Sequence, residues 1–324
     1  MKNAVSRLWS IIKGALPGTV QTCIWVVKLT VSVSFCIVIL RYLQVIPWIS
    51  ALLEPVFHVV GLPGEAALAF VSGYFVNVYS AIAVAVTLDL SIREMTILAA
   101  MVLCAHNMIV ESAVQKKTGT PAVRIVIYRT LSAVILGLTL NWIIPAESVQ
   151  AVAQGVQEEE LLFWPMLKEW AVSTVGLVIK MVLIIFSLNI LQRILSEFGV
   201  IKWISKFLRP LLTVFGLPAQ SSFLWIIANV VGLAYGAAAM IDEASTGKLS
   251  QKDVDLTNYH ICISHSNMED VFLLASVGAV WWILILSRWV MSIILVWGYR
   301  FELWIRNKFV PLCAFMWSNV NTKS

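Results

Sequence analysis

Apolar windows long enough to cross a membrane recur along the whole chain, and they restrict the possible folds more than any other feature. A helix needs about 20 mostly apolar residues to span a bilayer. Charged residues make up only 13% of the sequence, against about 25% in a soluble domain. The chain is therefore predicted to be an all-α polytopic membrane protein in contact with a lipid bilayer. The windows cover residues 20–44, 66–88, 95–114, 124–145, 165–192, 219–241, 261–276 and 279–299.

The segment before the first long window, residues 1–19, has the pattern of an amphipathic helix lying on a membrane surface. Lys2, Arg7 and Lys13 stand among apolar residues such as Trp9. A cleaved signal peptide is the alternative, although the compact apolar core and the small-residue cleavage site are missing. The five cysteines have no metal-ligand spacing and predict neither disulfides nor zinc. The net charge of +5 is ordinary for membrane loops and indicates no nucleic-acid partner.

The two halves of the chain share residues at a nearly constant offset, which indicates a duplicated unit. The matches are separated by 152 positions at the start of the repeats, by 155 around the Gly-Leu-Pro turns and by 159 further along the chain. We therefore predict two repeats, residues 20–145 and 165–300, joined by an acidic linker at 146–164 and followed by a cytoplasmic tail at 301–324. The matched residues include Gly61, Pro63, Gly73, Ser91, His106, Glu111 and Arg129, which fall on Gly216, Pro218, Gly232, Ser250, His265, Asp270 and Arg288.

A short apolar segment in each repeat leads into a Gly-Leu-Pro turn and then into another apolar segment. Thirteen helical residues cover only about 20 Å, less than the hydrocarbon core of about 30 Å. We predict re-entrant helical hairpins over residues 47–88 and 202–242, so that each repeat has about three transmembrane helices plus a hairpin. Two ordinary spanning helices joined by a tight interfacial turn are the alternative.

Polar groups gather at matched places deep in both repeats, in AHNMIVES and in ICISHSNMEDV. Ser91 predicts a helix start, and the fifteen residues from there to His106 rise about 22 Å. Ionisable groups are costly in lipid and usually line a pathway, so their presence in both halves favours a functional role over structural packing. His106 and Glu111 are five residues apart. They share a helix face only if the helix unwinds near Asn107 and, in the second half, near 266–267.

The distribution of basic residues predicts the topology. If the N-terminus is cytoplasmic, basic segments such as Lys116-Lys117 and Lys202 to Arg209 also fall inside, as the positive-inside rule expects. The second repeat then starts from the opposite side of the membrane, so the repeats are inverted. Many secondary transporters use this arrangement to build a site at the membrane midplane. Both termini are expected to be cytoplasmic.

The segment GLAYGAAAMIDEASTGKLSQKD, the following HSNMED, and the Gly-Leu-Pro turns in both halves resemble the nucleoside-recognition or Gate domain membrane proteins. That group includes the spore maturation proteins A and B, and Gate domains also occur in concentrative nucleoside transporters and ferrous iron transporters. The resemblance covers most of both halves. It implies a bacterial cytoplasmic membrane protein with re-entrant hairpins and a solute site between their tips.

Two classes of function compete. We expect a secondary transporter or facilitator rather than an enzyme, and its solute is expected to be small, polar or anionic, and nucleoside-like. The candidate coupling ions are a proton, sodium and a divalent cation. The protein could also form a homo-oligomer. The alternatives are a metal transporter or metal-dependent enzyme, with His106, Glu111, His265 and Asp270 as ligands, and a membrane assembly factor. The candidate substrate-binding residues are Gly61, Pro63, Glu65, Asn77, His106, Asn107, Glu111, Gly216, Pro218, Gln220, Asn229, Tyr235, His265, Ser266, Asn267, Glu269 and Asp270.

Overall fold

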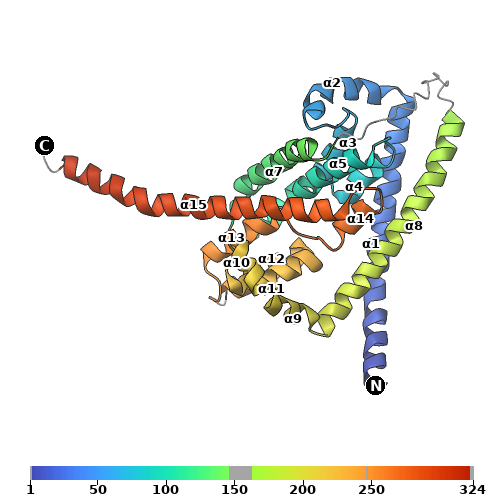
Figure 1. Ribbon diagram of the computed structural model, residues 1–324. Helices are drawn as coiled ribbons and strands as arrows, with labels where there is room; N and C mark the ends of the chain where they lie inside the picture. The colour runs from blue at the N-terminus through green and yellow to red at the C-terminus, as the bar shows by residue number, and fades with distance from the viewer. Residues whose placement is uncertain (1, 146–162, 246, 322–324) are drawn as a thin grey trace.

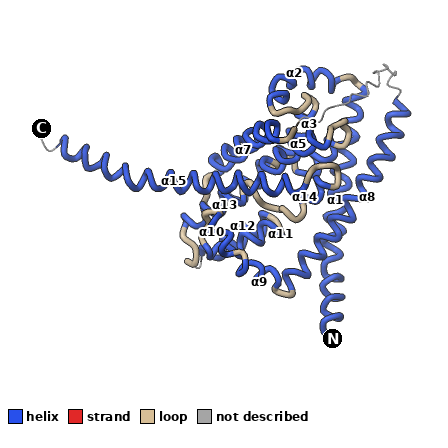
Figure 2. Tube along the Cα trace, in the orientation of Figure 1, coloured by secondary structure: helices blue, strands red, loops and turns tan. Residues whose placement is uncertain are grey.

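The computed structural model describes residues 2–145, 163–245 and 247–321, and these residues form helices and loops without a strand (Figure 2). The first half contains α1 (Lys2–Tyr42), α2 (Val45–Val59), α3 (Ala66–Phe75), α4 (Val78–Ala85), α5 (Ile92–Ala105), α6 (Met108–Lys117) and α7 (Ala122–Ile143). The second half contains α8 (Phe163–Glu197), α9 (Val200–Phe207), α10 (Arg209–Val214), the 3-10 turn η1 (Ala219–Ser221), α11 (Ser222–Val230), α12 (Leu233–Ser245), α13 (Gln251–Ile261), α14 (Asp270–Ala275) and α15 (Trp281–Asn321).

Five segments of the described chain are long and apolar enough to cross a membrane. They are Leu16–Tyr42, Ile92–Lys117, Ala122–Ile143, Phe163–Glu197 and Trp281–Lys308. Three belong to the first half and two to the second. The segment of the second half that corresponds to Ile92–Lys117 consists of the short helices α13 and α14, which are separated by the loop at 262–269.

The two halves lie in opposite orientations. The long helices α1 and α8 pack against each other and run in opposite directions, and α2 and α9 lie at opposite ends of the molecule (Figure 1). In the first half α5 packs against α7, and in the second half α13 packs against α15. These features confirm the predicted fold class, an all-α membrane protein built from two inverted repeats.

The Gly-Leu-Pro turns connect short helices in both repeats, α2 to α3 and α10 to η1 and α11. Gly61 and Gly216 have φ of +73° and +74°, a region that costs a side-chain-bearing residue about 1–2 kcal/mol. At Gly61 a Cβ atom would also lie 2.0 Å from Oδ1 of Asn141. Glycine is therefore required by both conformation and space. The re-entrant path of these hairpins in a membrane stays a prediction.

Each repeat extends a turn onto the other repeat. The turn between α6 and α7 packs on α13, where Thr120 Oγ1 donates to Asp255 Oδ1 at 2.7 Å and Asn258 Nδ2 donates to Thr118 Oγ1 at 2.6 Å. The corresponding turn between α14 and α15 packs on α5, where the Val280 N–H donates to Thr96 Oγ1 at 3.0 Å. We call these the α6–α7 contact (residues 118–121) and the α14–α15 contact (residues 277–280).

The described chain begins and ends in long helices. The predicted surface helix covers residues 1–19, and its described residues, 2–19, continue without a break into the rest of α1, which ends at Tyr42. Residues 301–321 of the predicted tail continue α15, which extends beyond the rest of the molecule (Figure 1). The predicted acidic linker lies outside the described residues except for 163 and 164, which begin α8.

Candidate functional site

Helix α5 ends at the start of the polar cluster of the first repeat, the segment AHNMIVES at residues 105–112. It starts at a capping box, in which the Ser91 side chain accepts from the Glu94 N–H and the Glu94 carboxylate accepts from the Ser91 N–H. It ends at Ala105, and Asn107 takes a left-handed conformation with φ +48° before α6 begins. Because of the break, the Asn107 N–H makes no helical hydrogen bond. It donates instead to the Gly73 carbonyl at 2.9 Å. This break is the one that the spacing of His106 and Glu111 requires.

The second repeat breaks at the matched position. Helix α13 also starts with a capping box, formed by Ser250 and Asp253, and ends at Ile261. Ser266, the counterpart of Asn107, likewise has φ +48°. Its N–H donates to the Ala228 carbonyl at 3.0 Å. Two left-handed non-glycine residues at matched positions indicate a built feature, because such residues are uncommon and are tolerated only where the surroundings hold them.

A buried arginine holds the first break. Arg129 is fully buried on α7, and its guanidinium donates to the Cys104 carbonyl at 2.8 Å and to the His106 carbonyl at 2.7 Å. These carbonyls stand at the end of α5 and lack helical donors. The same Nη2 lies 2.8 Å from the Glu111 carboxylate. Arg129 therefore ties the end of α5 to the start of α6.

Arg288 repeats this function in the second half. It is fully buried on α15, and it donates to the Ile263 carbonyl at 2.7 Å and to the His265 carbonyl at 2.8 Å. Its third partner is neutral, since Nη1 donates to Asn267 Oδ1 at 2.8 Å. The backbone contacts of the two arginines match, but only Arg129 is paired with a carboxylate.

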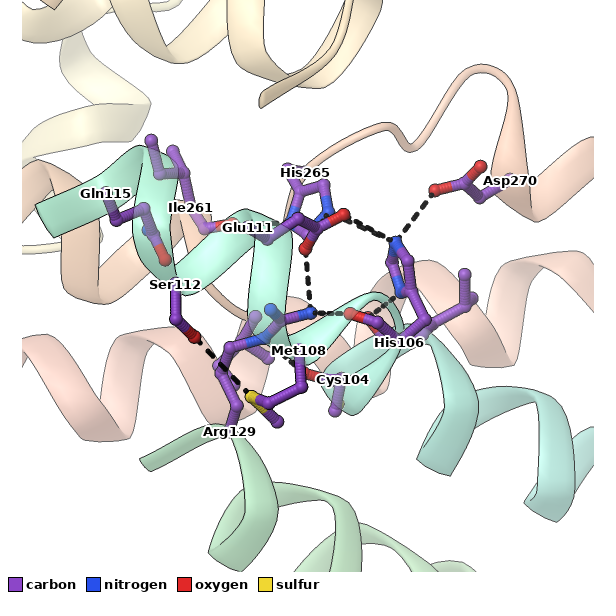
Figure 3. A network of polar contacts seen from close by, with 12 residues as sticks. Cys104, His106, Met108, Glu111, Ser112, Gln115, Arg129, Ile261, His265 and Asp270 are labelled. Atoms are coloured by element: carbon purple, nitrogen blue, oxygen red, sulfur yellow. Dashed lines mark hydrogen bonds and ion pairs between the residues drawn. The ribbon is translucent and has the colours of Figure 1, made fainter. Parts of the chain in front are cut away.

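The two histidines, one from each repeat, lie next to each other (Figure 3). Their Nε2 atoms are 3.3 Å apart. The Glu111 carboxylate spans the pair, with Oε1 at 3.1 Å from His106 Nε2 and Oε2 at 3.2 Å from His265 Nε2. Asp270 Oδ2 lies 3.5 Å from His106 Nε2. All four side chains are buried. His106, His265 and Asp270 each place one ligand atom within 4.8 Å of the others, so they could hold a metal ion.

The polar cluster of the second repeat, the segment ICISHSNMEDV at residues 261–271, contains further polar residues that contact both repeats. Tyr79 on α4 donates to the Glu269 carboxylate. Asn267 Nδ2 donates to Asn229 Oδ1 at 2.6 Å, and it also reaches Ser264 Oγ at 3.1 Å. Residues from α4, α11 and the loop before α14 therefore support the cluster from both repeats.

The turn residues predicted for the site lie in other contacts. The Gly61 carbonyl accepts from Arg93 at 3.4 Å, and the Gly216 carbonyl accepts from Arg300 at 2.7 Å. Gln220 is exposed and donates to Asp253 at 3.4 Å. Among the described residues, no hydrogen bond or ion pair of these three residues reaches the two histidines.

Five further predicted residues also occupy the hairpin regions or their flanks. Pro63, Glu65 and Pro218 are partly buried at the turns. Asn77 caps α4 and accepts from the Ser80 N–H at 3.0 Å, a structural role that accounts for its polarity. Tyr235 on α12 is 65% exposed, so it faces away from the cluster.

Sequence reasoning did not place Arg129, Arg288 and Tyr79 in the site. The arginines had a signal, because they match at the same offset of 159 that pairs the two histidines. A buried arginine needs anionic or carbonyl partners, and two matched ones point to matched partners. The repeat offset gives no such signal for Tyr79, because its partner Glu269 lies in the other repeat and is not its matched residue.

Comparison with known proteins agrees with this architecture. The chain is an internally duplicated helical membrane protein whose broken helices meet at a buried His and acid cluster. The Gate family, described as nucleoside recognition, matches residues 23–116 and 178–269, and the chain belongs to this family. It is 29% identical over 288 residues to the uncharacterized membrane protein YvoD of Bacillus subtilis (strain 168), which covers 88% of this chain and 92% of that protein. No solved structure matches significantly.

Proposed function

We propose that this protein is a secondary transporter or facilitator of a small polar or anionic solute, and that nucleosides are the first class to test. The observation that carries the proposal is the pair of helix breaks at 106–107 and 265–266. Inverted repeats whose helices break at a central site are the usual construction of alternating-access transporters. The description of the family as nucleoside recognition supports the choice of solute.

The contacts between the repeats suit a rocking motion. The α6–α7 contact and the α14–α15 contact attach each repeat to the other at matched turns. Releasing one contact while keeping the other would expose the cluster to one side at a time. In this mechanism His106, Glu111, His265 and Asp270 contact the solute or the coupling ion, and Arg129 and Arg288 keep the broken helix ends in place.

The proposed location is the bacterial cytoplasmic membrane with both termini cytoplasmic. The basic residues near Lys116 support this orientation through the positive-inside rule. A cysteine at Lys116 should be labelled only from the cytoplasmic face. A cysteine at Glu158, outside the described residues, should be labelled only from the opposite face. Labelling of both from one face would contradict this topology.

Uptake into proteoliposomes tests the proposal. The purified protein should accumulate radiolabelled uridine or adenosine with saturation, and His106→Gln and Asp270→Asn should abolish uptake while the protein remains folded. His58→Gln is the matched control, because His58 is exposed and lies outside the cluster. Absence of uptake for both nucleosides and for a panel of small anions would count against transport.

A measurement without a solute separates transport from an assembly role. Alternating access predicts that a cysteine at Asn267, which is partly buried in the loop at the cluster, can be labelled by an impermeant reagent from either face. A cysteine at Ile97, fully buried on α5, should not react from either face. An assembly factor with one fixed conformation would expose Asn267 to one face at most.

A further inference from the structure

The two central histidines have the same tautomer, which the backbone fixes. His265 Nδ1 lies 2.7 Å from the Ile261 carbonyl, and His106 Nδ1 lies 3.2 Å from the carbonyls of Val102 and Leu103. A carbonyl oxygen can only accept, so each Nδ1 carries the hydrogen. In the neutral ring each Nε2 then presents a lone pair. Histidines that ligate metals almost always donate their other N–H in this way.

The groups that face these lone pairs are also acceptors. The two Nε2 atoms are 3.3 Å from each other, and carboxylate oxygens of Glu111 and Asp270 lie 3.1–3.5 Å from them. Four acceptors in a buried space repel one another unless a positive charge lies among them. Arg129 reaches only one oxygen of Glu111. It does not lie between the imidazoles.

The charge around the cluster also favours a cation. Three carboxylates, those of Glu111, Glu269 and Asp270, surround the site, and two guanidinium groups, those of Arg129 and Arg288, hold its backbone. With neutral imidazoles these groups sum to one negative charge. A buried charge is costly unless it is paired, so binding of a cation compensates it.

The spacing of the acceptors fits a particular kind of cation. Ligand atoms about 2.0–2.1 Å from a tetrahedral zinc ion are about 3.3 Å from each other. The two Nε2 atoms are 3.3 Å apart, and His106 Nε2 lies 3.5 Å from Asp270 Oδ2. Each Nε2 also faces its own oxygen of Glu111, at 3.1 Å for His106 and Oε1 and at 3.2 Å for His265 and Oε2. Imidazole nitrogen suits Zn²⁺ and Fe²⁺, whereas Ca²⁺ takes six or more oxygen ligands and Mg²⁺ keeps oxygen ligands in an octahedron.

We propose that His106, His265, Asp270 and Glu111 form a binding site for one divalent transition-metal ion. Both Nε2 atoms and an oxygen of Asp270 are the ligands that already lie together, and the Glu111 carboxylate, which faces each imidazole with a different oxygen, supplies the remaining ligand. Arg129 orients Glu111, and the backbone carbonyls orient the imidazoles. The site lies where the two repeats meet, so each repeat supplies one histidine and one acid. This proposal goes beyond transport and stands without it, because it concerns binding alone.

Zinc binding to the purified full chain in detergent tests the proposal. After treatment with a chelator, the protein is mixed with Zn²⁺, desalted and analysed for metal. We expect one zinc per chain, and at least a 100-fold loss of affinity in His106→Gln and His265→Gln. His58→Gln should retain the full amount. A wild type that retains no zinc, which would mean that the site holds only a proton, overturns the proposal, as does equal binding in His265→Gln.

Cobalt gives a readout that loss of folding cannot mimic. Co²⁺ bound to His265→Cys should produce a thiolate-to-metal charge-transfer band in the near ultraviolet, and the wild type should lack this band. The band would demonstrate direct ligation at position 265 even if the glutamine variants are unstable. If His265→Cys is folded by size-exclusion chromatography, binds Co²⁺ and still lacks the band, residue 265 is not a ligand and the proposal fails.

Discussion

Replacement of Arg129 by methionine should destabilise the protein more than any other single change at the cluster. Arg129 is fully buried and pairs with Glu111 at 2.8 Å, and breaking a buried ion pair costs about 3–5 kcal/mol. The change also removes donors from two helix-end carbonyls, at about 1 kcal/mol each. We therefore expect a loss of about 5–7 kcal/mol in the free energy of unfolding.

Arg288→Met is the matched control. It removes the same pair of carbonyl contacts, but its third partner is the neutral Asn267, so we expect a loss of about 3 kcal/mol, or about 1 kcal/mol for each hydrogen bond. In a Glu111→Gln background the Arg129→Met change should cost up to about 3 kcal/mol less than in the wild type, since no carboxylate is left unpaired.

The assay is unfolding in mixed micelles with increasing sodium dodecyl sulfate, followed by the fluorescence of the fourteen tryptophans. The free energies of the four proteins in the cycle give the coupling between positions 111 and 129. Equal losses in Arg129→Met and Arg288→Met, or an unchanged cost in the Glu111→Gln background, would refute the ion pair as the source of the effect.

Three further predictions use the caps, the turns and the contacts between repeats. Ser91→Ala should cost about 1 kcal/mol in the same unfolding assay, because it removes the capping box of α5; no change would show that the box is energetically neutral. Gly61→Ala should cost at least 1–2 kcal/mol, about the penalty of a left-handed conformation alone, whereas Gly176→Ala in open space on α8 should be neutral or stabilising; equal effects would contradict the conformational argument. Oxidation of the pair Thr120→Cys and Asp255→Cys, in a background without other cysteines, should lock the α6–α7 contact and stop uptake until a reductant is added; uptake by the oxidised protein would argue against opening at this contact.

The repeat pattern predicted a large part of the architecture. The offset of 159 pairs His106 with His265 and Glu111 with Asp270, and all four residues meet in the structure. The spacing also made a helix break near Asn107 the condition for His106 and Glu111 to share a face, because a five-residue separation on an intact helix points two side chains apart. Duplicated sequence is informative in this way because two inverted copies place matched residues about one axis.

The differences between the copies could not be predicted from the pattern. Glu111 contacts both histidines, whereas Asp270 contacts only His106 in the described structure. Aspartate is one methylene shorter than glutamate, and α14 begins only at Asp270, so the second acid approaches from another direction. Whether the hairpin tips approach the histidines depends on how the helices pack in three dimensions. The local sequence of the tips does not specify that packing.

The sharing of one acid between two histidines has a consequence for the order of assembly during synthesis. His106, Glu111 and Arg129 contact one another within the first repeat. His265, by contrast, finds its carboxylate partner in a helix made about 150 residues earlier, a separation over which loop closure is slow. The first repeat can therefore enter the membrane with its charges already paired. The second repeat completes its own polar cluster only by docking onto the first, which makes the earlier half the template for the later one.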